Sequence, residues 1–268
     1  MMNNHKEIIT QLVNFIDKFD TYGNLKRDMS LFSITIGTLR KDRSIALNIL
    51  RNTTPECDGL GAIALSRILI EDYLHLVYLN DNSDDSKENI DRFNIHPKIE
   101  NYLSLKSMEN WGFEIENTLE NKVMIEDIKN EFNKNKNKFL RRKESDNGFD
   151  ADDYYRTWTC TGLDKLISKT DLTKTDNGRK SLKYMTEMYS FGSNVIHHNS
   201  FLIWLLACQD KRLITDEYSD IALNVTFNIL SNLINLTIEI SQTIRKDEKI
   251  HGQLLDELAD IMEGKNIG

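Results

Sequence analysis

The stretch LGAIALSRILIEDYLHLVYL, residues 60–79, is apolar on nearly every side when it is drawn as a helix. A helix without a polar face is surrounded by other helices in a folded protein. Apolar residues also recur at i, i+3 and i+4 in almost all of the remaining sequence, and the chain has only two prolines, Pro55 and Pro97. The sequence therefore predicts an all-α fold, a multi-helix bundle built around this segment.

The helices and their division into domains can be placed coarsely. Thr54 can cap the third helix and Pro55 suits its first turn. ESDNGFDADD, residues 144–153, is rich in turn formers and joins two halves of the bundle. Helices are expected at 4–20, 29–52, 56–80, 86–108, 112–139, 161–169, 177–198 and 216–262. The predicted domains are an N-terminal helical extension (1–55), a core helical bundle (56–245) and a C-terminal helix (246–268).

Two ladders of polar residues interrupt the apolar helices. The members of each ladder are four residues apart, so they lie on one side of a helix. Because a buried charge needs polar partners, we expect the two ladders to face one another and to form a buried polar centre. The first ladder consists of Arg67, Glu71 and His75, and the second consists of Tyr189, Ser193 and His197.

The second ladder ends in SNVIHHNS, residues 193–200, where two histidines are adjacent. His197 continues the ladder, whereas His198 points about 100° away and is expected at the surface or at the helix end. The centre is interpreted in two ways. It is a catalytic or binding site, or it is a network of polar contacts that only stabilises the bundle.

Three segments together resemble a bacterial helical family catalogued as a domain of unknown function. They are RILIEDYLHLVYL, YYRTWTCTGLDKLI and YMTEMYSFGSNVIHHNS, and the resemblance spans about residues 56–245. The family features fall on Arg67, Glu71, Trp158, Tyr184, Tyr189, Ser193 and His197, with Ile196 in place of the usual Val. The resemblance implies a helical fold and no particular activity.

The chain more distantly resembles HEPN domains, helical bundles that include metal-independent ribonucleases of toxin–antitoxin and anti-phage systems. That resemblance implies an Arg and a His as the reacting groups. In the corresponding hypothesis for this chain, His197 is the acid or base, Arg67 from another helix is the phosphate clamp, and Glu71 orients Arg67. The chain departs from the HEPN pattern because Ser193, not an Arg, precedes His197. The only literal Arg-x5-His match, RKDEKIH at 245–251, lies in a charged segment that is expected to be exposed.

The charge distribution limits nucleic-acid binding to a local segment. A net charge of −8 opposes a broad nucleic-acid-binding surface. KNKNKFLRRK, residues 134–143, is the local exception, and its Lys138, Arg141 and Arg142 are candidates for contacting RNA phosphates or an acidic partner. The alternative is a solvated helix end and linker.

Other chemistries lack their motifs. No H-E-x-x-H or Gly-rich phosphate loop occurs, and E-x-x-H occurs once, at 248–251, so neither a metal site nor a cofactor is expected. Three widely spaced cysteines and the absence of a secretory pattern favour the cytoplasm. Residues 221–244 carry one charge and a stripe of four asparagines, which predicts a central or interface helix, open to homodimer formation, and not a membrane span.

Two functions follow from these observations. In the first, the protein is a toxin-like effector of a bacterial defence or toxin–antitoxin system, a HEPN-like ribonuclease with an RNA substrate. In the second, it is a non-enzymatic interaction module that binds a protein partner or antitoxin, and the Arg/Glu/Ser/His network is structural.

Overall fold

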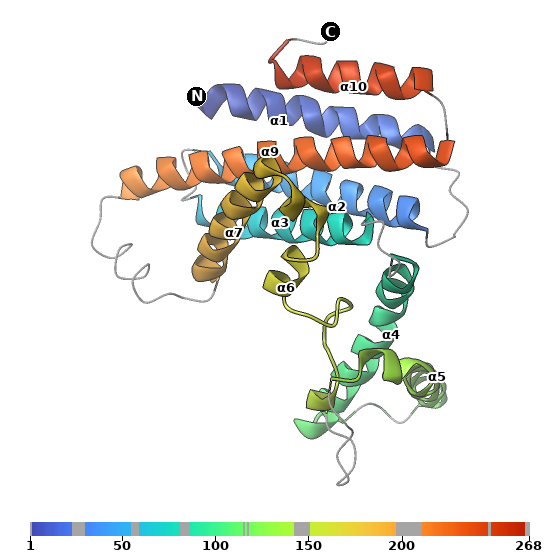
Figure 1. Cartoon of the computed structure of the whole chain (residues 1–268). Helices are drawn as coiled ribbons and strands as arrows, with labels where there is room; N and C mark the ends of the chain where they lie inside the picture. The colour runs from blue at the N-terminus through green and yellow to red at the C-terminus, as the bar shows by residue number, and fades with distance from the viewer. Residues whose placement is uncertain are drawn as a thin grey trace. The chain divides into compact units, whose positions relative to one another are not determined.

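The computed structural model confirms the all-α prediction (Figure 1). It describes residues 2–22, 30–54, 59–80, 86–114, 116, 118–141, 151–196, 211–245 and 248–265. The helices are α1 (Met2–Ile16), α2 (Leu31–Asn52), α3 (Leu60–Asn80), α4 (Ser86–Asn110), α5 (Leu119–Asn135), α6 (Leu163–Ile167), α7 (Asp176–Ile196), α9 (Lys211–Arg245) and α10 (Glu248–Met262). Within these ranges, the only extended pairing is one antiparallel bridge between Leu140 and Tyr154.

The chain forms two compact units that are not consecutive in sequence. The first unit comprises residues 1–81 and 169–268, and the second comprises residues 82–168. The predicted division, with limits at residues 55 and 245, differs from this one. A hydrophobic pattern shows that a helix is buried, but it does not show which other helices share its core.

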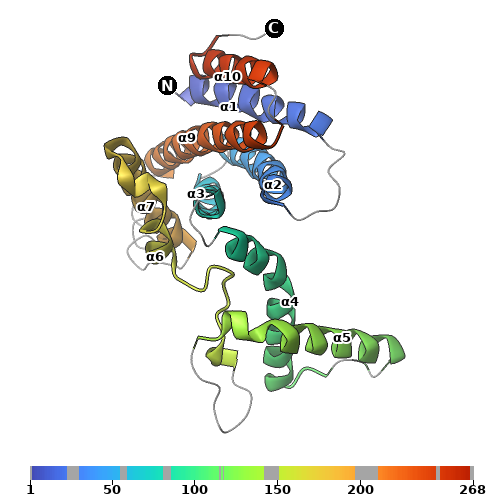
Figure 2. The same cartoon turned by 45° about the vertical axis from the view of Figure 1, so that its right-hand side comes forward.

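In the first unit, α3 is the central helix, as its all-round apolar sequence predicts. It packs against α9, α2 and α7, and Figure 2 views α3 nearly along its axis with these three helices around it. Leu69, Ile70 and Leu74 of α3 have no exposed surface. Burial of each such side chain contributes roughly 1.5–3 kcal/mol to folding.

The long helix α9 connects this core to a second layer. Helix α1 packs against both α9 and α10, and it lies between them in Figures 1 and 2. Asn224 and Asn232 are on the exposed side of α9, whereas Leu223 and Leu230 are fully buried. Residues 217–242 are long and apolar enough to cross a membrane, but 67% of their most apolar window is buried within the protein, as in a core helix.

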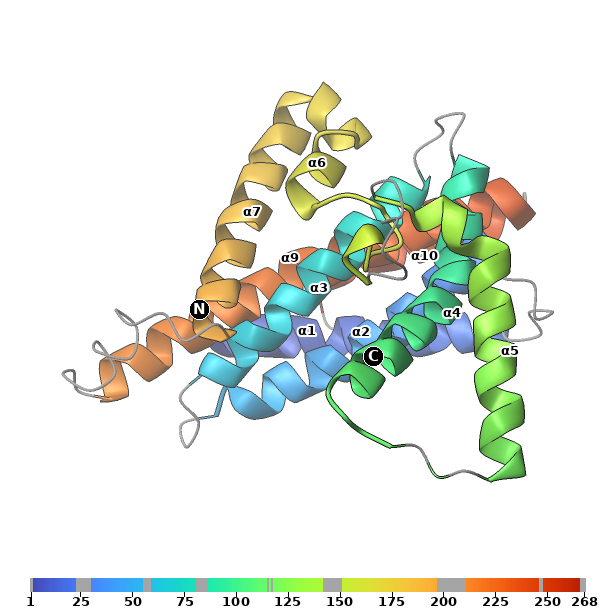
Figure 3. The same ribbon diagram turned by 90° about the horizontal axis from the view of Figure 1, so that it is seen from below.

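The second unit is built on α4 and α5, which lie side by side in Figure 3. Its core is aromatic. Phe132 of α5 stacks on Tyr102 at 4.0 Å between ring centroids and meets the edge of Tyr154 at 5.1 Å. Phe93 of α4 meets Trp158 edge-on at 5.4 Å. Residues 154–158 form neither a helix nor a strand, and these aromatic contacts hold them against the two helices.

The described helices differ from the predicted ones at three places, and the predicted start of the third helix, residue 56, lies outside the described residues. The described α3 begins at Leu60 because Gly59 has φ +71°, which is not helical, while Pro55 lies outside the described residues. Helix α5 begins at Leu119, where Thr118 Oγ1 accepts a hydrogen bond from the Asn121 amide at 3.1 Å. The last predicted helix, 216–262, is two helices, and α10 packs back against α1 and α9.

Candidate functional site

The two predicted ladders meet where α3 crosses α7. The guanidinium of Arg67 donates a hydrogen bond from Nη2 to the Tyr189 hydroxyl at 2.7 Å. The same guanidinium lies over the Tyr189 ring, 4.6 Å from its centroid. Both side chains are half-buried. The prediction that the two ladders face one another is therefore confirmed at this pair, which combines a hydrogen bond with a cation–π contact.

A close approach of the two backbones makes this contact possible. Gly192, on α7, is buried, and a β carbon built on it would lie 2.9 Å from Cβ of Arg67 and 3.2 Å from the carbonyl oxygen of Ile63. A side chain at this position would push α7 away from α3. Gly192 was not among the predicted site residues, although a glycine inside an apolar helix is a signal of close packing.

Three other ladder residues lie on the same two helices. Glu71, His75 and Ser193 are half-buried on α3 and α7. Among the described contacts, the hydrogen bond of the Arg67 guanidinium goes to Tyr189, and the orienting role expected of Glu71 stays a prediction. The Nε of Arg67 is buried without a hydrogen-bond partner. His197 and His198 lie outside the described residues.

A buried acid in the same unit was not expected from the sequence. Asp42 of α2 is fully buried, and this burial, together with the nearby charge of Asp72 on α3, raises the pKa of its carboxyl to about 10. Lys41 forms an ion pair with Asp72 at 2.5 Å. Asp42 is therefore protonated at neutral pH. The sequence KDRS surrounds it with polar residues, so no pattern indicated its burial.

His251 corrects another expectation. The RKDEKIH segment was expected to be exposed, but the His251 side chain is only 2% exposed, and its Nε2 lies 2.7 Å from the Ser241 hydroxyl of α9. Helix α10 packs against α1 and α9, and these contacts bury His251. The charged residues beside His251 in the sequence therefore do not determine whether His251 is buried. The hydrogen bond gives His251 a structural role in joining α10 to α9.

Comparison with known proteins places this fold in a family. The sequence model of the family of unknown function DUF5677 matches residues 39–212, a range that includes Arg67, Tyr189 and Trp158. The chain belongs to this family. The predicted resemblance to a helical family of unknown function is thus confirmed. No curated protein and no solved structure matches the chain.

In this DUF5677 protein the family features are divided between the two units. Arg67 and Tyr189 meet in the first unit, whereas Trp158 is buried in the aromatic core of the second. Tyr184 contacts α9 through a long hydrogen bond of 3.4 Å to Asn224, and its pKa is raised by burial. Each unit thus contains its own set of the residues that carried the resemblance.

The predicted basic segment belongs to the second unit. Lys138 forms an ion pair with Asp91 of α4. Arg141 is exposed, and its backbone N–H donates to the Asp153 carbonyl at 2.7 Å. Arg142 lies outside the described residues. Of the basic residues singled out here, Lys138 has a half-exposed ion-pair partner, while Arg141 has none among the described residues.

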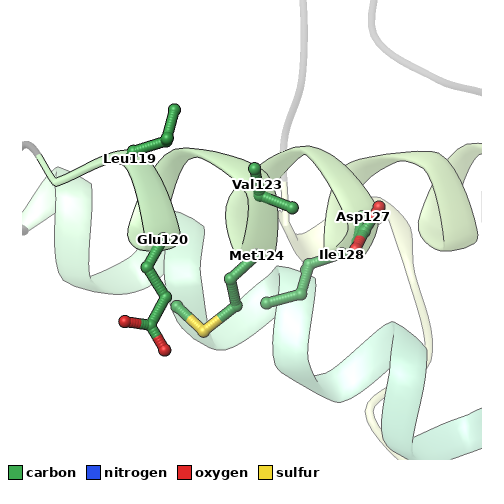
Figure 4. Close-up of a pocket in the computed structure, with 6 residues that line it drawn as sticks. All are labelled: Leu119, Glu120, Val123, Met124, Asp127 and Ile128. Atoms are coloured by element: carbon green, nitrogen blue, oxygen red, sulfur yellow. The ribbon is translucent and has the colours of Figure 1, made fainter.

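The DUF5677 protein also has an apolar concavity on α5 of about 690 Å³, shown in Figure 4. Leu119 is 80% exposed, Val123 56% and Met124 47%, and all three line it together with Glu120 and Asp127. In the described part of the chain, no three His, Cys, Asp or Glu side chains are grouped so that they could hold a metal ion.

Proposed function

We propose that the protein is an RNA-directed effector of a bacterial defence or toxin–antitoxin system, and that it acts in the cytoplasm as a metal-independent, HEPN-like ribonuclease. The observation that carries this proposal is the contact between Arg67 and Tyr189. It fixes the direction of a half-buried guanidinium on α3 near the end of α7. His197 follows the last residue of α7, Ile196, directly in sequence.

In the proposed reaction, the imidazole of His197 takes the proton from a ribose 2′-hydroxyl, and the 2′-oxygen attacks the adjacent phosphorus. The bond from phosphorus to the 5′-oxygen of the next nucleotide breaks, a 2′,3′-cyclic phosphate forms, and the imidazolium returns the proton to the leaving 5′-oxygen. The guanidinium of Arg67 binds the phosphate and stabilises the negative charge that develops on its oxygens. The hydroxyl and ring of Tyr189 hold the guanidinium, and in this proposal Glu71 also orients Arg67. Because the Tyr189 hydroxyl occupies only part of the guanidinium fork, other N–H groups remain for a phosphate.

The experiment compares wild type with Arg67→Ala and His197→Ala during expression in bacteria. Growth and the integrity of total RNA are followed, and thermal melts of the purified proteins are recorded. Lys180→Ala is the control because Lys180 is an exposed cation on the same helix as Tyr189. We expect RNA cleavage by wild type and by the Lys180→Ala control, and intact RNA with Arg67→Ala and His197→Ala. The melting temperature of His197→Ala is expected to equal that of wild type.

The opposite pattern would reject the ribonuclease. If RNA stays intact with wild type, and His197→Ala lowers the melting temperature by several degrees, His197 is a structural residue. Arg67→Lys separates charge from geometry, since Lys keeps the positive charge but loses the planar fork. Cleavage that survives Arg67→Lys and Arg67→Ala equally would remove Arg67 from the reaction.

A second candidate function is a non-enzymatic interaction module that binds a protein partner or antitoxin. The exposed apolar side chains of α5 favour it, because a monomer rarely leaves Leu119, Val123 and Met124 exposed together on one helix face. Met124→Lys with Val123→Lys is then expected to abolish partner binding without changing the melting temperature. Arg141→Glu with Arg142→Glu is expected to weaken capture of an acidic partner.

A further inference from the structure

The second unit contains a pocket of about 610 Å³ whose lining includes three cations, Arg141, Arg156 and Lys165. Two of these cations, Arg156 and Lys165, lie outside the basic segment that the sequence singles out. None of the lining residues that the structure describes is acidic. The pocket size is within the range of small-ligand sites, roughly 300–1,000 Å³.

Backbone pairing brings the cations together. The Arg141 N–H donates to the Asp153 carbonyl at 2.7 Å, and the Tyr155 N–H donates to the Phe139 carbonyl at 2.8 Å. These two bonds flank the bridge of Leu140 with Tyr154, and they set Arg141 beside the segment that carries Arg156. A turn follows, in which Cys160 has φ +52° and leads the chain into α6, the helix of Lys165.

Contacts with α4 make the pocket wall rigid. The Nε2 of His96 donates to the Arg156 carbonyl at 3.0 Å, and the Arg156 guanidinium donates to the Ser107 hydroxyl at 3.3 Å. Trp158, buried against Phe93 of α4, anchors the segment that carries Arg156. A wall held by buried aromatic rings and hydrogen bonds is organised before a ligand arrives.

Within the described residues, the cations of the pocket lack ion-pair partners. Within the described ranges, Arg141, Arg156 and Lys165 have no ion pair, whereas Lys138 and Lys98 in the same unit are paired with Asp91 and Glu131. Three cations gathered without a counter-charge repel one another, in a chain whose net charge is −8. An anion that enters the pocket relieves this repulsion.

The remaining lining groups suit a nucleotide. Thr161 brings a hydroxyl group that can donate to a phosphate oxygen, whereas the Thr157 hydroxyl donates to the Thr161 carbonyl at 3.4 Å. Tyr155 is a half-buried ring on which a base can stack. We propose that this pocket binds the phosphate group of a nucleotide, either free or at the end of a single-stranded RNA. The choice of RNA over DNA rests on the proposed function.

Binding is tested with the full chain and a single-stranded RNA decamer that carries a 5′-phosphate and a 3′-fluorophore, by fluorescence anisotropy at low salt. The pocket variant is Arg141→Gln with Lys165→Gln, two exposed side chains whose replacement does not disturb the core. The control is Lys122→Gln with Lys129→Gln, which changes the net charge equally on the exposed side of α5. Uridine 5′-monophosphate is added as a competitor.

We expect the pocket variant to weaken binding about tenfold and the control less than about twofold, because diffuse charge is screened and direct phosphate contacts are not. The salt dependence of log Kd should also fall by about 0.7 for each phosphate that the variant no longer neutralises. Displacement by the monophosphate identifies a free nucleotide as a ligand, and its failure to displace identifies the RNA strand. Equal weakening in both variants, or no RNA binding by wild type, overturns the proposal.

A steric variant checks the same pocket without altering charge. Gly162 lines the pocket, and a β carbon there would meet nothing within 4 Å. Gly162→Phe is expected to weaken RNA binding about as much as the double charge variant, while Gly162→Ala binds as wild type does. RNA binding by Gly162→Phe at wild-type strength would contradict the proposal that the pocket binds the phosphate. Thermal melts of each variant show whether it is folded.

The proposal of a nucleotide-binding pocket and the proposal of ribonuclease activity can be rejected independently. His197→Ala is expected to bind the decamer with unchanged Kd and to leave it intact. If wild type binds RNA through the pocket but never cleaves it, the ribonuclease is rejected and the pocket stands. If RNA is cleaved but binding is indifferent to Arg141, Lys165 and Gly162, the pocket is rejected and the ribonuclease stands.

Discussion

Replacing the buried Asp42 by Asn should make the protein more stable at neutral and alkaline pH. Burial of Asp42, and then the charge of Asp72, raise the pKa of its carboxyl from 3.8 to about 10 in the folded state. An unfolded chain ionises the same group near its ordinary pKa. Between these two values the folded state binds one proton more than the unfolded state, so stability falls as the pH rises.

The size of the effect follows from the width of that window. Each pH unit above 3.8 costs the wild type at most about 1.4 kcal/mol, which amounts to an upper bound of about 4 kcal/mol at pH 7. Asn is neutral at every pH and has nearly the same shape as the protonated carboxyl. The stability difference between Asp42→Asn and wild type should therefore grow by up to about 1.4 kcal/mol per pH unit from pH 5 to pH 9.

Thermal unfolding followed by circular dichroism at 222 nm, at a series of pH values, measures this difference. One kcal/mol corresponds to about 2–4 °C in Tm for a chain of this size. Asp220→Asn removes an exposed carboxylate on α9 and is expected to follow the wild-type pH dependence. If wild type and Asp42→Asn change in parallel with pH, Asp42 is ionised in the folded protein and the reasoning from its burial is wrong.

Three further predictions concern contacts between helices of the first unit. Tyr189→Phe removes the hydrogen bond to Arg67 but keeps the ring, so a decrease of about 1 kcal/mol in the free energy of denaturant unfolding is expected, and a larger decrease for Tyr189→Ala. Gly192→Ala places a methyl 2.9 Å from Cβ of Arg67, and a net destabilisation of about 1–3 kcal/mol is expected, whereas an increase in Tm would show that α7 has room to move. Ser241→Ala removes a hydrogen bond of the buried His251 and should increase hydrogen exchange in α10 with a destabilisation of about 1 kcal/mol; unchanged exchange would refute a role of this bond in holding α10.

Arg67 and Tyr189 illustrate how much of the candidate site could be predicted from the sequence. Their spacing within two apolar helices required polar partners, and physical chemistry left the opposite ladder as the natural partner. The hypothesis that Glu71 orients Arg67 stays a prediction, and the described hydrogen bond of the guanidinium goes to Tyr189. Spacing places two residues on one face of a helix, but the choice among rotamers depends on which side chain of the neighbouring helix lies closer.

The pocket of the second unit shows what the sequence could not supply. Arg141 was visible in a run of basic residues, but Arg156 and Lys165 are isolated cations in sequence. They meet Arg141 only because the chain forms the bridge between Leu140 and Tyr154 and turns at Cys160. A non-local pairing of this kind leaves no periodic pattern along the chain.

The sequence by itself determined the all-α fold, the central place of α3 and the burial of α9, because helical periodicity and all-round apolar character are local properties that follow from the solvation of each side chain. Tertiary structure alone decided that Asp42 and His251 are buried and that the chain divides into units 1–81 with 169–268 and 82–168. Burial of a polar residue is set by the helices packed over it, and those contacts join residues far apart along the chain.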